Sequence, residues 1–247
     1  MAVPTATRPL CEAALRQSEI FRSYETRKSA FCSPPARRQY LTWMTYLTYM
    51  SHKANLSSMT ASPPILAFNG DGLLPAGDYV LTLAELQDSL LVNGPAGKSE
   101  IPGWDMGWRM HLVENLGVLC RQLWQVGISE IYVDGSFVED KCHPNDIDGY
   151  FECDLQYLAS GHLERDLNLI DPHKVWTWDP SARRSCRGFS KRQLPMWHVY
   201  RVELYPHVGQ SSGLRDKHGN ELEFPSAFRL TRGQSLRKGI IKIGGER

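Results

Sequence analysis

The sequence contains no long hydrophobic run. No window approaches eighteen uninterrupted apolar residues, so the sequence predicts no membrane-spanning helix. The N-terminus also lacks the basic start and apolar core of a signal peptide, because Arg8, Glu12, Arg16 and Glu19 interrupt it. We therefore expect a cytoplasmic protein with no membrane partner.

Cysteine is too irregularly spaced to define a metal site or a set of disulfides. The six cysteines form no CxxC pair, which favours free thiols in a reducing compartment. Cys142, His143 and Cys153 offer three soft ligands, but without a fourth they make a poor zinc site.

The sequence also lacks an excess of charge of one sign. With 28 basic and 27 acidic residues its net charge is +1, which by itself does not predict a nucleic-acid partner. The distribution is uneven, because residues 1–60 carry eight basic and three acidic residues and the remainder is net acidic. The hydrophobic content of 42% is ordinary for a globular protein with a sizeable core.

The first sixty residues differ from everything that follows. They are rich in Ser, Thr and Arg, and their hydrophobic periodicity is weak. We predict an N-terminal extension over 1–60, disordered or appended, and one domain over 61–247. The alternative is a small helical appendage that uses the aromatic residues between Tyr40 and Tyr49.

Helix signals are clear in the predicted domain. Thr82 and Glu85 form a capping box that opens a short helix through Leu91. Apolar residues at helical spacing predict a longer helix over 108–126, which Gly127 ends. A further helix is expected over 155–170, broken near Gly161.

Short β-branched and aromatic runs predict strands over 128–134, 146–153 and 197–205, with an edge strand over 239–243. The expected fold class is α/β (α+β). The sequence predicts a mixed sheet of three to five strands, with helices packed on one side.

Three carboxylates fall on these predicted strands. Asp146 and Asp148 are two positions apart, so they would share one side of a strand while Ile147 enters the core. Glu203 lies in the middle of another predicted strand. Carboxylate oxygens suit magnesium, so Asp146, Asp148 and Glu203 are expected to hold two Mg²⁺ ions.

A glycine-containing turn precedes these carboxylates. Gly135 and Ser136 follow the first strand, where backbone and hydroxyl groups can approach a phosphate closely. Lys141 could reach a phosphate across the following loop. The basic loop 183–192 is either a solvated surface or a segment that binds a triphosphate or an RNA backbone.

One pattern in the sequence resembles the motif of the nucleotidyltransferase superfamily. It consists of Gly135-Ser136, nine further residues, then Asp146 and Asp148, and finally the distant Glu203. DNA polymerase β, the kanamycin nucleotidyltransferases and the minimal prokaryotic nucleotidyltransferases typify that superfamily. The resemblance implies a nucleotidyltransferase-type fold, with Ser136, Asp146, Asp148 and Glu203 as the catalytic set.

A second resemblance covers residues 65–245. It is to a bacterial and phage family of unknown function with a predicted nucleotidyltransferase core, and it implies the fold without supplying a substrate. The motifs that carry it are Phe68-Asn69-x-x-Gly72-Leu73-Leu74-Pro75, Asp134-Gly135-Ser136-Phe137-Val138, Lys141-x-x-Pro144-x-Asp146-Ile147-Asp148, Tyr205-Pro206 and Lys238-Gly239-Ile240.

These resemblances predict a magnesium-dependent transferase that moves an NMP group from a nucleoside triphosphate to an acceptor hydroxyl. The acceptor can be RNA, a protein or a small molecule. Two alternatives stay open. One is a non-catalytic module that binds a nucleotide or a partner protein in a toxin–antitoxin or phage-defence system. The other is a metal-dependent phosphodiesterase.

Overall fold

A computed structural model describes residues 67–95, 103–216, 218–231 and 235–245. The predicted N-terminal extension lies outside these residues, as do Cys11 and Cys32. Cys120, Cys142, Cys153 and Cys186 form no disulfide bond with one another. No helix in this described part of the chain is long and apolar enough to cross a membrane.

Five strands form a mixed sheet in the order β1-β7-β2-β3-β4. β1 is parallel to β7 and β3 is parallel to β4, whereas β2 is antiparallel to both of its neighbours. The protein therefore has an α+β fold built on a mixed sheet. The strand bounds are Asp78–Leu81 (β1), Ile131–Asp134 (β2), Ile147–Glu152 (β3), Val202–His207 (β4) and Ile240–Ile243 (β7).

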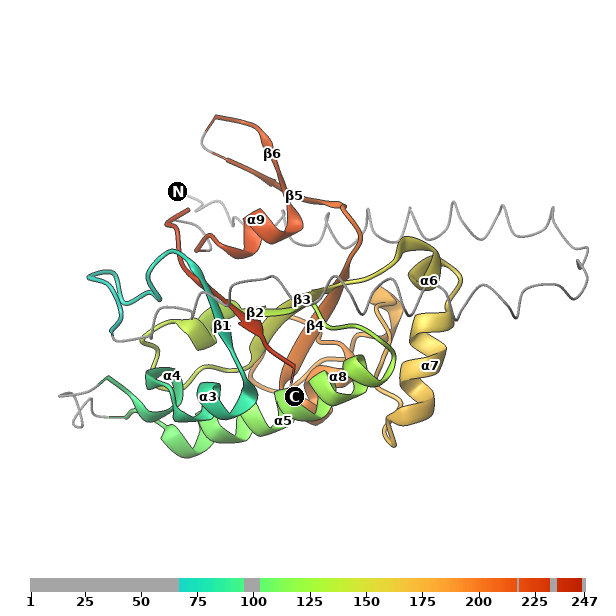
Figure 1. Cartoon of the computed structure of the whole chain (residues 1–247), viewed down its shortest axis with the longest axis horizontal. Coiled ribbons are helices and arrows are strands. Elements are labelled where there is room, and N and C mark those ends of the chain that lie inside the picture. Colours follow the sequence, from blue (N-terminus) through green and yellow to red (C-terminus); the bar gives the residue numbers. More distant parts are fainter. Residues whose placement is uncertain (1–66, 96–102, 217, 232–234, 246–247) are drawn as a thin grey trace, which may run out of the picture.

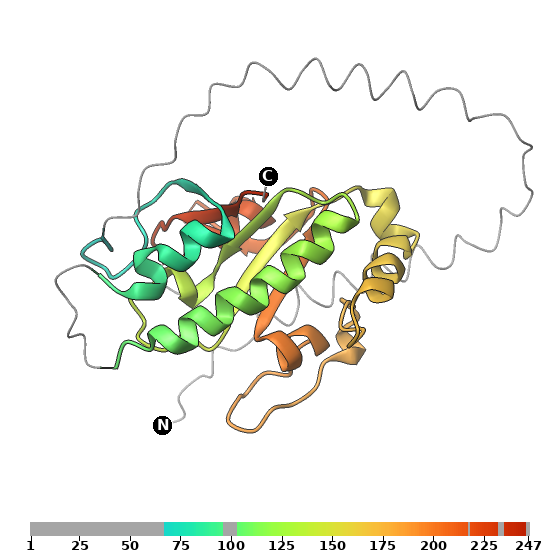
Figure 2. The ribbon, with the colours of Figure 1, turned by 60° about the horizontal axis from the view of Figure 1, so that its bottom comes forward.

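Helices cover one face of this sheet. The capping box of Thr82 and Glu85 opens α3, as predicted, and α4 follows it directly. The long α5 lies over the sheet (Figure 2). Its buried apolar residues belong to the core. Leu163 and Leu167 of α7 join the same core. The helix bounds are Leu83–Asp88 (α3), Leu90–Asn93 (α4), Met106–Gln125 (α5), Leu155–Ala159 (α6), His162–Ile170 (α7) and Pro195–Tyr200 (α8).

The opposite face is also partly covered, which corrects the expectation of helices on one side alone. The short α9 (Phe224–Phe228) and the two-stranded sheet of β5 (Ser211–Arg215) and β6 (Glu221–Glu223) lie above it in Figure 1, away from α3, α5 and α8. Phe228 packs edge-on against Tyr150, with ring centroids 5.4 Å apart.

Two of the predicted strands need correction. Residues 197–205 do not form one strand, because α8 occupies 195–200 and β4 begins only at Val202. Pro195 starts the helix, and Arg201 ends it in a left-handed conformation with φ of 55°. The strand near the C-terminus is not at an edge, since β7 lies between β1 and β2.

Candidate functional site

Three acidic residues stand in one row across the sheet. Asp148 of β3 is in register with Asp134 of β2 on one side and with Glu203 of β4 on the other. Residues in register share a face, and here it is the face opposite α5. Asp134 and Glu203 are only 2% and 4% exposed, whereas Asp148 is half-buried. Asp148 is therefore the member of the row that a ligand can reach.

The turn after β2 lies against this row. Gly135 has a φ of 78°, and a Cβ atom there would come within 2.7 Å of the Asp148 carboxylate. Glycine is therefore required both by conformation and by space. Residues Gly135–Val138 form a short 3-10 helix in which Ser136, directly after Gly135, is half-buried.

Asp134 is a buried acid that the sequence did not single out. Lys238 Nζ lies 3.1 Å from its Oδ1, yet that oxygen accepts no hydrogen bond of good geometry from any described residue. Burial raises the pKa of Asp134 to about 7, although the nearby ammonium of Lys238 works in the opposite direction. The same ammonium binds the Gly135 carbonyl and the Glu139 carboxylate, each at 3.0 Å. Lys238 thus fixes the turn as well as the row.

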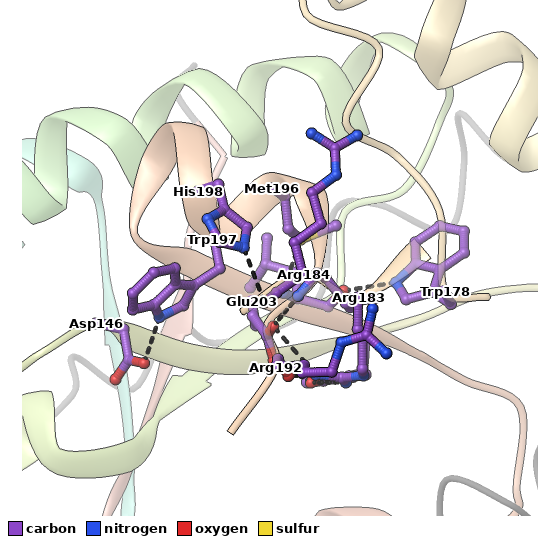
Figure 3. A network of polar contacts seen from close by, with 12 residues as sticks. Asp146, Trp178, Arg183, Arg184, Arg192, Met196, Trp197, His198 and Glu203 are labelled. Carbon is purple, nitrogen blue, oxygen red and sulfur yellow. Dashed lines mark hydrogen bonds and ion pairs between the residues drawn. The ribbon is translucent and has the colours of Figure 1, made fainter. Parts of the chain in front are cut away.

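Glu203 is held by groups of the protein itself. Its Oε1 accepts a hydrogen bond of 2.8 Å from the Leu194 amide and lies 3.5 Å from Arg183 Nη1 (Figure 3). Its Oε2 accepts a hydrogen bond from the Tyr205 hydroxyl. That hydroxyl accepts one of 2.9 Å from Arg183 Nη2, so the three side chains form a closed ring.

Asp146 lies just before β3 and is half-buried. Its Oδ2 accepts a 2.7 Å hydrogen bond from Trp197 Nε1, which Figure 3 shows at the edge of the same network. The Arg201 guanidinium stacks 3.9 Å above the Trp197 ring. Ile147 is fully buried as expected, so Asp146 and Asp148 flank a core residue.

A second buried cation supports the loop between the turn and Asp146. Arg109 of α5 is fully buried and donates to four backbone carbonyls, those of Leu91, Phe137, Glu139 and Lys141. Its guanidinium stacks 4.1 Å from the Trp104 ring. This fixes the backbone of Lys141, whose side chain is exposed.

The remaining ligand candidates lie apart from this row. His143 binds Asp105 at 2.9 Å and stacks on Trp108, so it is not positioned with Cys153 for zinc. Cys153 lies near the far end of β3, with its sulfur 3.8 Å from the His207 carbonyl oxygen. Among the described residues, no three acidic, histidine or cysteine side chains converge closely enough to hold a metal ion.

The donor chemistry therefore divides the three predicted metal ligands. Asp146 and Asp148 are half-buried carboxylates of the kind that Mg²⁺ prefers. Glu203 fits that role less well, because it is only 4% exposed and its two oxygens already contact Arg183, Tyr205 and the Leu194 amide. Asp146 and Asp148 are therefore the two predicted ligands whose burial leaves them open to an ion.

The chain is an α+β protein with a mixed sheet and an acidic row beside a glycine turn. Residues 66–244 match the DUF6932 family, which is described as a family of unknown function, and the chain belongs to that family. No curated protein and no solved structure matches the chain.

Proposed function

We propose that this protein is a magnesium-dependent nucleotidyltransferase with a nucleotidyltransferase-type fold. One observation carries the proposal: Asp148 lies in register between Asp134 and Glu203 and directly against the Gly135 turn. This combination provides clustered carboxylates next to a turn through which backbone and hydroxyl groups can approach a phosphate. The motif order in the sequence supports the same function.

Asp146 and Asp148 are the residues proposed to hold magnesium. When bound, the ion supplies positive charge that offsets the charge of the transferred group. We do not propose Glu203 as a further metal ligand, because it is buried and already contacts Arg183, Tyr205 and the Leu194 amide. Trp197 instead acts on Asp146 by fixing the direction of its carboxylate.

The reaction forms a bond between an acceptor hydroxyl oxygen and the α-phosphorus of a nucleoside triphosphate. It breaks the bond from that phosphorus to the bridging oxygen, whose electron pair leaves with pyrophosphate. The hydroxyl proton passes to Asp148, the reachable carboxylate of the row. Ser136 and Lys141 bind the β- and γ-phosphates of the leaving group.

A second function deserves a test because of the ring of Arg183, Tyr205 and Glu203. A site whose third carboxylate is already neutralised could bind a nucleotide without transferring it. Such a module could act on a partner protein, as in a toxin–antitoxin or phage-defence pair.

The two functions differ in their products. We would incubate the full chain with magnesium, each of the four ribonucleoside triphosphates, and total cell RNA or protein. Mass spectrometry of acceptors that gain one nucleoside monophosphate, with release of an equal amount of pyrophosphate, is the expected result. Nucleotide binding without any adduct would favour the non-catalytic module, and monophosphate formation without an adduct would favour a phosphodiesterase.

A further inference from the structure

The ring around Glu203 places a permanent positive charge in the acidic row. Arg183 comes from the basic loop between η3 (Pro180–Ala182) and α8, far from β4 in sequence terms but joined to it through Glu203 and Tyr205. Its side chain is 23% exposed, so the guanidinium is neither enclosed nor fully solvated. This charge therefore lies beside the register neighbour of Asp148, since Arg183 contacts Glu203.

Three contacts hold the guanidinium in place. Besides its contacts with Glu203 and Tyr205, Arg183 donates a hydrogen bond of 3.1 Å to the Arg192 carbonyl oxygen. This bond links the two ends of the basic loop 183–192. Burial lowers the pKa of Arg183, but its contacts with Tyr205 and Glu203 outweigh this and leave it above its ordinary value. The side chain is therefore charged at every physiological pH and pre-positioned.

The same guanidinium retains binding capacity. An arginine has five N–H donors, and the contacts just described engage two nitrogens, Nη1 and Nη2, with three acceptors. Nε and the second proton of Nη2 make no hydrogen bond that is described here. A planar, delocalised cation with donors to spare matches the geometry of a phosphate.

The neighbourhood of Arg183 also reaches Asp148. Arg183 contacts Glu203, and Glu203 is in register with Asp148 on the neighbouring strand, so the guanidinium lies next to the acidic row. We therefore interpret Glu203 and Tyr205 as the residues that position the Arg183 guanidinium, not as metal ligands.

We infer that Arg183 is the second cation of the site: it binds a phosphate of the triphosphate directly, in the place where a second magnesium ion was expected, and Glu203 is its positioning residue. This inference rests on the proposed function for the identity of the ligand. It predicts that one metal ion, not two, accompanies each bound triphosphate.

The test counts metal ions and measures phosphate affinity, so that it does not depend on turnover. Inorganic tripolyphosphate is the ligand, because it needs no matching base, and Mn²⁺ replaces Mg²⁺ because bound and free Mn²⁺ are distinguished by electron paramagnetic resonance. Calorimetry gives the affinity of the full chain for tripolyphosphate. The variants are Arg183→Ala, Arg183→Lys and Glu203→Gln, with Arg184→Ala as the control from an exposed position of the same loop.

We expect one Mn²⁺ per parent chain with bound tripolyphosphate. Arg183→Ala should weaken tripolyphosphate binding by about 10- to 100-fold, the range for hydrogen bonds to charged groups, without changing the metal count. Arg183→Lys should fall between, since it keeps the charge but loses the planar fork. Glu203→Gln should also keep the metal count, and Arg184→Ala should bind within about 3-fold of the parent.

Three results would overturn the inference: two Mn²⁺ ions in the parent, loss of an ion in Glu203→Gln, or equal affinities for Arg183→Ala and Arg184→Ala. If Arg183→Ala does not fold, the comparison of Arg183→Lys with Arg184→Ala decides. Failure of the proposed function has a different signature, because a parent that binds tripolyphosphate through Arg183 but transfers no nucleotide would retain this site without that activity.

Discussion

The two faces of the central sheet carry different kinds of residue, although they belong to the same strands. The face against α5 presents fully buried apolar residues such as Val133, Ile147 and Leu204. The opposite face presents Asp134, Asp148 and Glu203 in register. Because side chains alternate along a strand, each of these strands supplies both the core and the candidate site. Substitutions on one face should therefore alter stability, and substitutions on the other should alter the candidate site.

The largest effect on stability is expected on the apolar side. Leu116 of α5 is fully buried in the core, so Leu116→Ala should lower the free energy of unfolding by about 2–5 kcal/mol. Leu169→Ala is the matched control, because Leu169 of α7 is 80% exposed and its truncation should cost less than about 0.5 kcal/mol. Urea unfolding measures both. Similar losses for the two variants would contradict the assignment of the core.

A substitution of Arg109 tests how much this buried, charged residue of α5 contributes to stability. Arg109→Met keeps much of the length of the side chain but leaves four backbone carbonyls without their donor. We expect destabilisation of about 3 kcal/mol or more. Arg121→Met, at an exposed position of the same helix, should change stability by less than about 0.5 kcal/mol. Equal melting temperatures for both variants would show that the carbonyl contacts contribute little.

Asp134 combines features of both faces of the sheet, because it lies on the polar face and is nevertheless buried. Its pKa of about 7 is far above the ordinary value, so between about pH 4 and 7 the unfolded chain loses a proton that the folded chain keeps. The stability that this group contributes is complete at low pH and is lost as pH rises through 7. Asp134→Asn lacks this dependence.

The melting temperature of Asp134→Asn relative to the parent should therefore rise between pH 5 and pH 8. Asp88→Asn, an exposed acid at the end of α3, serves as the control and should show a nearly constant difference. A difference for Asp134→Asn that stays flat or falls with pH would mean that Lys238 compensates the buried carboxylate fully.

The smallest effect on stability is expected at Asp148. Asp148→Asn removes a like charge near Asp134 but also an attraction to Arg183, so the two changes oppose each other. We expect the free energy of unfolding to change by less than about 1 kcal/mol, measured by urea unfolding at pH 7. A loss comparable to that of Leu116→Ala would mean that the acidic row is part of the core rather than a site.

Local signals predicted much of this fold. The Thr82 and Glu85 capping box, the apolar stripe of α5 and the break at Gly161 were all read correctly from the sequence. The start of β4 was wrong because the run from Trp197 to Tyr205 is aromatic and β-branched, as in a strand, whereas its first residues form a turn of helix after Pro195. A run this short does not distinguish helix from strand.

Contacts between distant segments were the part that the sequence could not supply. The position of β7 inside the sheet depends on pairing with β1 and β2, which no local pattern encodes. Arg109 did leave a signal, since it precedes Leu112, Val113 and Leu116 at helical spacing and so sits on the buried stripe. The partnership of Arg183 with Glu203 left none, because it joins a loop to a strand twenty residues away.

One labelling measurement tests whether the acidic row supports nucleotidyl transfer. The parent and Asp148→Asn, which we expect to be equally stable, are each given magnesium, total cell RNA or protein, and triphosphates labelled at the α-phosphate or at the γ-phosphate. We expect only the α-label to join an acceptor, and we expect Asp148→Asn to transfer it at least about 100-fold more slowly. Transfer of the γ-label, or equal α-label transfer by both proteins, would contradict this expectation.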